Sequence, residues 1–186
     1  MRKLILSMML SLDGLVARPG RYGAGNWGLP PDDPSLKKRK LSWFRDIGLH
    51  LMGRATYEEM AGFWPTSDDA YAAPMNEIPK VVFSQTLERA DWPESRIARG
   101  ELAVEIAALK REPGKDMLAW GGAAFAQALS RLELVDEYRL ILQPVALGEG
   151  LPLFKDLKAP LRLELVDSAT FSTGTMLNTY RRASIS

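Results

Sequence analysis

Short apolar runs, each nearly continuous, constrain the fold of this chain more than any other feature of its sequence. They span residues 3–10, 49–52, 80–84 and 117–120. Such runs are typical of strands that are covered on both faces, as in parallel sheets. Helix-like stretches separate them, around residues 41–44 and at 102–110 and 123–132. Strands that alternate with helices predict crossover connections around a largely parallel sheet.

The C-terminal part of the chain follows a different pattern. Apolar and polar side chains alternate there over residues 137–145, 161–166 and 175–181. Glycine turns lie between these runs, at 147–150 and 172–174, and alternating runs around a glycine turn predict an antiparallel hairpin. We therefore predict a single α/β domain of three layers over residues 1–186. Its mixed central sheet is expected to be mostly parallel, with the antiparallel hairpin at one edge.

The composition excludes several classes of function. The 24 Lys and Arg residues nearly balance the 23 Asp and Glu residues, so we expect no nucleic-acid partner and no anionic membrane surface as partner. The chain has no cysteine and a single histidine, His50. This excludes thiol nucleophiles, disulfides and metal sites that need several Cys or His ligands. We expect no metal, and we expect His50 to pack in the core.

The N-terminus superficially resembles a signal peptide. Its apolar run ends at Ser11, before Asp13 and Gly14, and no small-residue cleavage site follows. No stretch approaches the ~20 apolar residues that cross a bilayer. We interpret residues 3–10 as a buried strand, and because cysteine is absent we expect a cytoplasmic protein.

Two long segments lack a regular pattern. Residues 18–31 are rich in Gly and Pro, and residues 63–79 are similarly irregular. Long loops in compact domains often act as lids or binding loops. The second segment fits a binding loop and a plain surface loop equally well.

Two apolar runs end in glycine and lead directly into a helix-like stretch. The first continues from Met52 into Gly53 and Arg54, and the second from Trp120 into Gly121. A helix start presents unpaired N–H groups and a partial positive charge, and glycine lets a phosphate approach the backbone. Because ligands of open α/β sheets bind at the carboxyl ends of the strands, two such starts can grip the two phosphates of one dinucleotide.

Each helix start also has a purely structural interpretation. Thr56 and Glu59 fit the capping-box pattern, in which the threonine hydroxyl satisfies its own helix. Gly121 and Gly122 fit a tight turn between strand and helix. Arg54 favours the phosphate interpretation, because a positive charge at a helix start is unfavourable without an anion beside it.

Several segments match motifs of one known family, and they do so in the family's order along nearly the whole chain. They are residues 11–17 (SLDGLVA), 52–58 (MGRATYE), 80–87 (KVVFSQTL), 120–122 (WGG) and 144–154 (PVALGEGLPLF). The chain thus resembles the dihydrofolate reductase-like family, which includes the reductase domain of the bacterial riboflavin-biosynthesis deaminase-reductase. The resemblance implies a three-layer dihydrofolate reductase-like fold and a homodimer. It also implies hydride transfer from NADPH to a small heterocyclic or carbonyl substrate.

The resemblance assigns a set of residues to the cofactor, all at strand ends or helix starts. They are Val16, Ala17, Gly53, Arg54, Thr56, Ser84, Gln85, Gly121, Gly122, Ala123 and Phe125. In the family a basic residue often stands near position 85 and binds the adenosine 2′-phosphate. Gln85 is neutral, and Arg54 can supply that charge instead, because arginine suits bidentate phosphate contact. We expect NADPH, and NADH is not excluded.

The substrate end departs from the family's pattern. Dihydrofolate reductases carry a carboxylate on the helix after the first loop, and the equivalent position here falls near Lys40. Dihydrofolate is therefore not the expected substrate. Asp32 or Asp33 replaces that carboxylate only if the loop folds back. The candidate substrate-binding residues are Met9, Trp27 and Asp32.

Asp13 is the candidate catalytic residue, as a proton donor that follows the first strand beside the expected nicotinamide pocket. The Asp13–Gly14 pair is equally typical of a turn, and water can deliver the proton instead.

Aromatic residues gather in sequence near the expected cleft, where they form either a pocket for a flat conjugated substrate or part of the core. They are Trp27, Trp43, Phe44, Phe63 and Trp64. Two other functions stay open. One is a non-catalytic nucleotide-binding or sensor module. The other is the pyrimidine reductase of riboflavin synthesis, which must recognise a ribosyl phosphate, and the sequence shows no second basic cluster for it.

Overall fold

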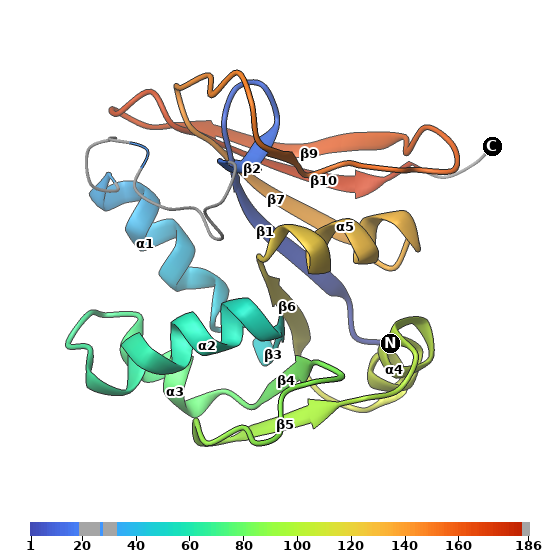
Figure 1. Ribbon diagram of the computed structural model, residues 1–186. Helices are drawn as coiled ribbons and strands as arrows, with labels where there is room; N and C mark the ends of the chain where they lie inside the picture. The colour runs from blue at the N-terminus through green and yellow to red at the C-terminus, as the bar shows by residue number, and fades with distance from the viewer. Residues whose placement is uncertain (19–26, 28–32, 184–186) are drawn as a thin grey trace.

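An eight-stranded sheet forms the centre of the computed structural model, which describes residues 1–18, 27 and 33–183 (Figure 1). Along the sheet the strands follow the order β5-β4-β3-β6-β1-β7-β10-β9. Their bounds are β1 Leu4–Leu10, β3 Ile47–Gly53, β4 Lys80–Phe83, β5 Ser95–Ala98, β6 Asp116–Trp120, β7 Glu137–Leu142, β9 Leu163–Thr170 and β10 Met176–Arg182. The short strands β2 (Leu15–Ala17) and β8 (Leu151–Pro152) pair with each other.

The strand directions confirm the predicted fold class. Every neighbouring pair from β5 to β7 is parallel, whereas β10 is antiparallel to both β7 and β9. The strands β9 and β10 form the predicted hairpin, around a turn in which the Phe171 N–H donates to the Thr175 carbonyl at 2.9 Å. The glycine turn at 147–150 leads into β8, which the sequence did not indicate.

Helices cover both faces of the sheet (Figure 1). Their bounds are α1 Pro34–Trp43, α2 Arg54–Phe63, α3 Ala72–Glu77, α4 Leu102–Arg111 and α5 Ala123–Arg131, with a short 3₁₀ turn, η1, at Trp64–Thr66. The predicted helical stretches correspond to α1, α4 and α5, whereas α3 and η1 lie inside the segment 63–79 that was predicted to be irregular. No helix that the structure describes is long and apolar enough to cross a membrane.

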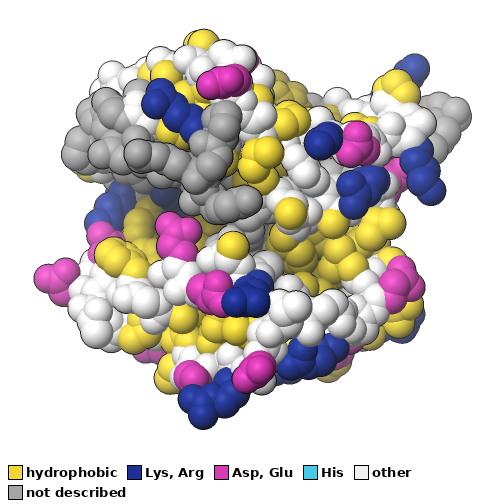
Figure 2. All heavy atoms as spheres, in the orientation of Figure 1, with side chains coloured by type: hydrophobic (Ala, Val, Ile, Leu, Met, Phe, Trp, Pro, Cys, Tyr) yellow, Lys and Arg dark blue, Asp and Glu magenta, His cyan; other side chains and the backbone are white. Residues whose placement is uncertain are grey.

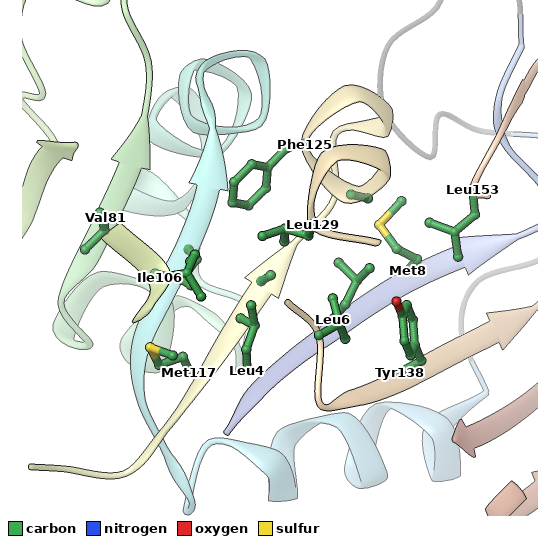
Figure 3. Close-up of a cluster of buried hydrophobic side chains, with 14 of the residues drawn as sticks. Leu4, Leu6, Met8, Val81, Ile106, Met117, Phe125, Leu129, Tyr138 and Leu153 are labelled. Carbon is green, nitrogen blue, oxygen red and sulfur yellow. The ribbon is translucent and has the colours of Figure 1, made fainter. Parts of the chain in front are cut away.

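The largest hydrophobic cluster packs between the sheet and the helices α4 and α5. Strand β1 shows how the sequence builds it, since alternate residues of a strand point to opposite faces. Leu4, Leu6 and Met8 enter this cluster, and Ile5 packs in a separate cluster with Ile47 and Leu118. The neighbours that close the large cluster include Val81, Ile106, Met117, Phe125 and Leu129 (Figure 3). Burial on both faces explains why these strands read as continuous apolar runs.

His50 is fully buried, which confirms that it packs in the core. Its Nδ1 accepts a hydrogen bond from the Trp120 indole at 2.9 Å, and its Nε2 lies 3.3 Å from the Pro74 carbonyl oxygen. The proton of the neutral ring therefore sits on Nε2, since Nδ1 is an acceptor. Burial lowers the pKa of His50 to about 4, so the ring is uncharged at neutral pH.

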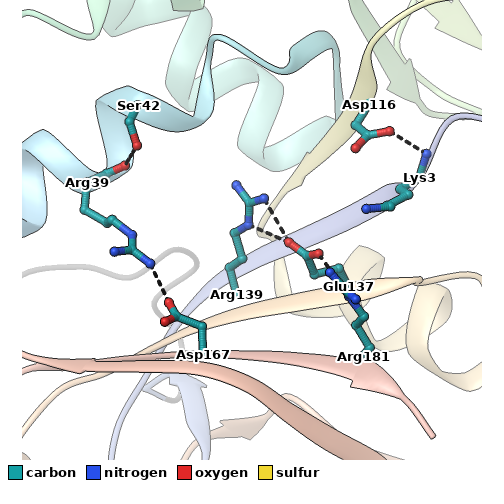
Figure 4. Close-up of polar contacts among 8 residues, drawn as sticks. All are labelled: Lys3, Arg39, Ser42, Asp116, Glu137, Arg139, Asp167 and Arg181. Carbon is teal, nitrogen blue, oxygen red and sulfur yellow. Dashed lines mark hydrogen bonds and ion pairs between the residues drawn. The ribbon is translucent and has the colours of Figure 1, made fainter.

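Helix α1 is fastened to the antiparallel edge of the sheet. Asp33 caps the helix by accepting from the Ser35 N–H at 2.7 Å. The same carboxylate accepts from the Ser172 N–H at 3.1 Å, in the turn between β9 and β10. Farther along the helix, Arg39 forms an ion pair with Asp167 of β9 (Figure 4). The start and the middle of α1 are thus both tied to the C-terminal hairpin.

A cluster of charged residues lies beside that ion pair (Figure 4). Glu137 of β7 accepts from the Arg139 Nε at 2.9 Å and lies 3.8 Å from the Arg181 Nε. The Arg139 guanidinium also lies 4.8 Å from the centre of the Trp43 ring. Because Glu137 is buried between two guanidinium groups, its charge is compensated. These residues line a second cavity, of about 260 Å³.

Candidate functional site

A cavity of about 420 Å³ opens at the carboxyl ends of β1 and β6, between α1 and α2. Figure 2 shows hydrophobic side chains inside a hollow to the left of centre, between those two helices. Met8 and Met9 of β1 and Met60 of α2 contribute to this wall. The volume and the apolar wall are those of a small-molecule site.

The two glycine-fronted helix starts meet at the rim of this cavity. The Thr56 hydroxyl, on α2, donates to the Gly121 carbonyl, just before α5, at 3.0 Å. A Cβ atom on Gly122 would lie 2.8 Å from the Thr56 hydroxyl oxygen, and one on Gly53 would lie 3.2 Å from the Phe125 Cβ. Gly122 has a φ of 88°, a conformation that side-chain-bearing residues rarely adopt. The backbone at Gly122 therefore lies closer to the Thr56 side chain than a residue with a Cβ atom would permit.

The contact between the helix starts replaces the capping box that the sequence suggested. The residue at the N-cap of α2 is Gly53, and Thr56 is the third residue of the helix. Its hydroxyl reaches across to the other helix start and so does not cap its own helix. Among the residues that the structure describes, no side chain accepts from the first N–H groups of α2 or α5. Two helix starts of this kind at one place can bind an anion.

The predicted cofactor residues fall into two adjoining groups. Six of them line the cavity: Val16, Ala17, Thr56, Gly121, Gly122 and Ala123. The other five are not in its lining: Gly53 and Arg54 lie at the start of α2, Ser84 and Gln85 follow β4, and Phe125 lies on α5. The two groups adjoin because Arg54 and Thr56 share the first turn of α2, and Ala123 and Phe125 share the first turn of α5.

The polar groups at the end of β4 are connected to each other. The Arg54 NH1 donates to the Thr86 hydroxyl at 2.8 Å, and the Ser84 hydroxyl oxygen accepts from the Leu87 N–H at 2.9 Å. The Gln85 amide donates to the Arg99 carbonyl at 2.7 Å. Glu58 also accepts from the Arg54 Nε at 2.7 Å, so the charge at the start of α2 is balanced within the helix.

Arg99 is a basic residue of this region that the sequence analysis missed. It is exposed, it directly follows β5, and its guanidinium donates to the Gln85 carbonyl at 3.1 Å and to the Leu87 carbonyl at 2.6 Å. The strand that places it has only four residues, Ser95–Ala98. A strand this short gives little periodic signal in sequence.

Asp13 accepts three different donors and does not line the cavity. The Ser11 hydroxyl donates to it at 2.5 Å, the Gly148 N–H at 2.8 Å and the Leu147 N–H at 3.1 Å. The Ser11 hydroxyl and then the Gly148 N–H lower the pKa of Asp13 to about 2. The carboxylate is therefore ionised at neutral pH, and it ties the turn before β2 to the segment before β8. This arrangement favours the turn-forming interpretation over a proton donor.

The residues predicted to bind the substrate lie in different places in the structure. Met9 lines the cavity, Trp27 is half-buried, and Asp32 lies outside the described residues. Asp33 is buried, and its carboxylate serves the α1 cap and the Ser172 turn, away from the cavity lining. From α1 the cavity receives Lys40, the position at which the sequence analysis noted a missing carboxylate.

The aromatic residues divide between pocket and core. Phe63 and Trp64 line the cavity, as one interpretation expected, but Trp43 and Phe44 belong to hydrophobic clusters. Trp120, which was not assigned to the pocket, lines it as well, immediately before the paired glycines. In the part of the chain that the structure describes, no three His, Asp or Glu side chains gather as a metal site.

Both the sequence and the fold are similar to those of known proteins. The family model described as the RibD C-terminal domain matches residues 2–177. The uncharacterized protein YyaP of Bacillus subtilis (strain 168) is 31% identical over 184 residues, which cover 96% of this chain and 94% of YyaP.

Two solved structures show the likeness of the fold. A provisionally assigned riboflavin biosynthesis protein from Shewanella sp. PV-4 has a TM-score of 0.77 at 24% identity, with 98% of this chain and 99% of that chain covered. Dihydrofolate reductase from Enterococcus faecalis, solved with NADP(H) and the ligand RAB-propyl, has a TM-score of 0.63 at 17% identity, with 98% and 97% covered. These likenesses confirm the predicted dihydrofolate reductase-like fold.

Proposed function

Because the chain belongs to the RibD C-terminal domain family, we propose that it is an NADPH-dependent reductase whose substrate is a small heterocyclic or carbonyl compound other than dihydrofolate. One observation carries the proposal: the starts of α2 and α5 meet at the Thr56–Gly121 hydrogen bond on the rim of the cavity. No described side chain caps either helix start, and a diphosphate is the anion that matches two such helix starts.

The proposal places the cofactor along the two groups of predicted residues. Gly53 and Gly122 would hold its diphosphate, Val16 and Ala17 would contact its nicotinamide end in the cavity, and Phe125 would contact its adenosine end. When bound, NADPH supplies the hydride that reduces the substrate. The protein orients the ring and keeps water away from it, and buried Val16 and Ala17 suit that role.

The choice of NADPH over NADH rests on two guanidinium groups. Arg54 and Arg99 both contact the segment 84–87 at the end of β4, where the 2′-phosphate is expected to lie. Arginine binds phosphate oxygens in pairs and keeps its charge at any physiological pH. NADH stays the alternative donor, because it lacks only the phosphate that these residues would bind.

The proton that completes the reduction comes from water in this proposal. Asp13 is ionised and bonded to three donors, so it acts by positioning β2, which carries Val16 and Ala17. Asp33 is also ionised, because the Ser172 hydroxyl and the Ser35 N–H lower its pKa to about 2.

A titration of the protein with NADPH, followed by cofactor fluorescence, tests the proposal. We expect the wild type to bind and Gly122→Ala to bind at least about tenfold more weakly, because the added Cβ collides with Thr56 and the backbone conformation is strained. Gly62→Ala is the matched control, since a Cβ there meets nothing within 4 Å. Circular dichroism checks that both variants fold. Absence of NADPH binding to the wild type at millimolar concentration would overturn the proposal.

The second candidate function is the pyrimidine reductase step of riboflavin biosynthesis, which the family membership favours. Its substrate carries a ribosyl phosphate, whereas the ionisable side chains in the described cavity lining are one lysine and one glutamate. Steady NADPH oxidation with the ribosylated pyrimidine phosphate, and not with other heterocycles, would select this candidate. Oxidation with any heterocycle would exclude a non-catalytic binding or sensor module.

The proposal includes a homodimer that forms through the outer edge of the sheet. The last strand of the described sheet is β9, and its Leu165 and Val166 side chains are 54% and 44% exposed. An apolar edge strand is a template for pairing with another chain. A second copy of this chain offers a matching edge.

A further inference from the structure

The second cavity, of about 260 Å³, lies between α1 and the antiparallel part of the sheet. Strand register builds its floor, because alternate residues of a strand lie on the same face of a sheet. Glu137 and Arg139 of β7 are paired across the strands with Arg181 and Thr179 of β10, and all four side chains line the cavity. The register of two strands therefore places two arginines and one glutamate on the same face, under α1.

The charges of this cavity are not balanced among the described residues that line it. They are the three arginines Arg39, Arg139 and Arg181 and the two carboxylates Glu137 and Asp167. Arg39 and Asp167 form an ion pair with each other. Glu137 is shared by the other two arginines, since it accepts from the Arg139 Nε at 2.9 Å and lies 3.8 Å from the Arg181 Nε. One carboxylate cannot neutralise two guanidinium groups, so the lining has one positive charge in excess.

Arg139 has an unused donor at one end of its guanidinium group. Its side chain is only 17% exposed, and its Nε and NH2 both serve Glu137. Its NH1 is buried, and in the part of the chain that the structure describes no acceptor lies within hydrogen-bond distance of it. Figure 4 shows this nitrogen on the side of the guanidinium turned away from Glu137. A buried donor without an acceptor is unfavourable, and an oxygen atom that reached it would remove that penalty.

We propose that this cavity binds a small oxyanion, the carboxylate or phosphate group of a ligand, between Arg139 and Arg181. The anion supplies the counter-charge that Glu137 alone does not provide. Guanidinium groups bind carboxylate and phosphate oxygens in pairs. The Arg181 side chain is 54% exposed, so the anion meets it first, and a small rotation of the Arg139 guanidinium then brings NH1 to the same anion.

This site is separate from the one that the proposed function uses. Among the described residues, no side chain lines both cavities. None of the residues that the resemblance assigns to NADPH lines the second cavity. The oxyanion is therefore a further ligand of the protein and not a part of the cofactor.

Calorimetric titrations with inorganic phosphate and with acetate test the inference, with the ionic strength held constant by sodium chloride. We expect the wild type to bind at least one of the two, and the tighter one identifies the group that the site takes. Arg181→Gln should weaken that binding at least about tenfold, because it removes one charge-assisted hydrogen bond. Glu137→Gln should tighten it by about the same factor, because it removes the carboxylate that competes for both guanidinium groups.

Arg96→Gln is the matched control, since Arg96 is exposed on β5, at the other edge of the described sheet, and the substitution removes the same charge. Its affinity should stay within about twofold of the wild-type value, because charges this far apart are screened by salt. Gly122→Ala should also keep the binding, which separates this cavity from the helix starts of the proposed cofactor site. Circular dichroism checks the fold of each variant.

Three results overturn the inference. The first is a wild type that binds neither probe in excess of chloride. The second is an Arg181→Gln variant that binds as tightly as the wild type. The third is a folded Glu137→Gln variant whose binding is no tighter than that of the wild type. If Glu137→Gln does not fold, the comparison of Arg181→Gln with Arg96→Gln decides, because both of these residues are exposed.

Discussion

His50 makes the stability of this protein depend on acidity. Its ring is enclosed by Phe44, Trp120 and the Pro74 carbonyl. Its pKa of about 4 in the folded protein lies below the ordinary value of 6.5. The unfolded chain therefore binds the proton more tightly, and the free energy of unfolding falls as the pH drops from 6.5 towards 4. The full loss is about 3 kcal/mol.

We predict that His50→Asn flattens this acid dependence, because the amide oxygen can still accept from the Trp120 indole but does not titrate. Urea unfolding at several values between pH 7 and pH 4 measures the slope for both proteins. The variant is expected to be less stable at pH 7, since it leaves space where the ring packed. An unchanged slope in the variant would show that other groups cause the acid sensitivity.

The predicted cofactor residues share one property: the reason to predict them is visible in the local order of the sequence. Gly53 and Gly121 are predicted because each stands between an apolar run and a helical stretch. Trp120 and Arg99 were missed because their roles depend on which distant elements approach them. Trp120 meets a cavity wall made by α1 and α2, and Arg99 meets the segment after β4.

At the scale of elements, the hydrogen bonds at the start of α1 hold this helix, and with it one wall of the cavity, against the β9–β10 hairpin. The Asp33 carboxylate accepts from Ser35 in the helix and from Ser172 in the hairpin turn. The Ser172 hydroxyl bond and the Ser35 N–H bond lower the pKa of Asp33 to about 2. Its stabilising effect is therefore complete above the ordinary value of 3.8 and is lost as the pH falls towards 2.

We predict that Asp33→Ala lowers the melting temperature by several degrees and also weakens NADPH binding, because α1 forms one wall of the cavity proposed to hold the nicotinamide end. Differential scanning calorimetry and the fluorescence titration with NADPH give the two readings. Asp68→Ala is the control, since Asp68 is exposed and lies outside any helix. A loss of stability with unchanged NADPH binding would show that the cap of α1 does not shape the cavity.

The sequence did not predict the shortest elements, β2, β8 and α3. The strands β2 and β8 have three and two residues, and they exist because they pair across more than 130 positions of the chain. The helix α3 has six residues and begins after an irregular stretch. The long apolar strands and the helices α4 and α5 were predicted because each contains enough residues to show its period.

For the whole molecule, the fold class predicts where a ligand would bind. Parallel strands bring their carboxyl ends to one edge, and the helix starts that follow β3 and β6 meet there at the Thr56–Gly121 hydrogen bond. The order of the strands did not follow from the sequence, because strand pairing is non-local. Nothing in the local pattern of β1 indicates that β6 and β7 flank it.

We predict that Leu165→Lys turns a dimer into a monomer, because it places a charge on the exposed apolar edge strand β9. Light scattering after size-exclusion chromatography measures the mass. Val104→Lys is the matched control, since Val104 is a similarly exposed apolar side chain on α4, away from that edge. A wild-type protein that elutes as a monomer would remove the dimer from the proposal.

The attachment of α1 to the hairpin has a mechanical consequence. The helix α1, which forms one wall of the cavity, is anchored at Asp33 and Arg39 to the β9–β10 hairpin, and β9 carries the proposed dimer contact. A partner subunit that stiffens this hairpin would also reduce the motion of α1. Oligomeric state and ligand affinity should therefore vary together when β9 is altered, although among the described residues β9 contributes none to the cavity lining.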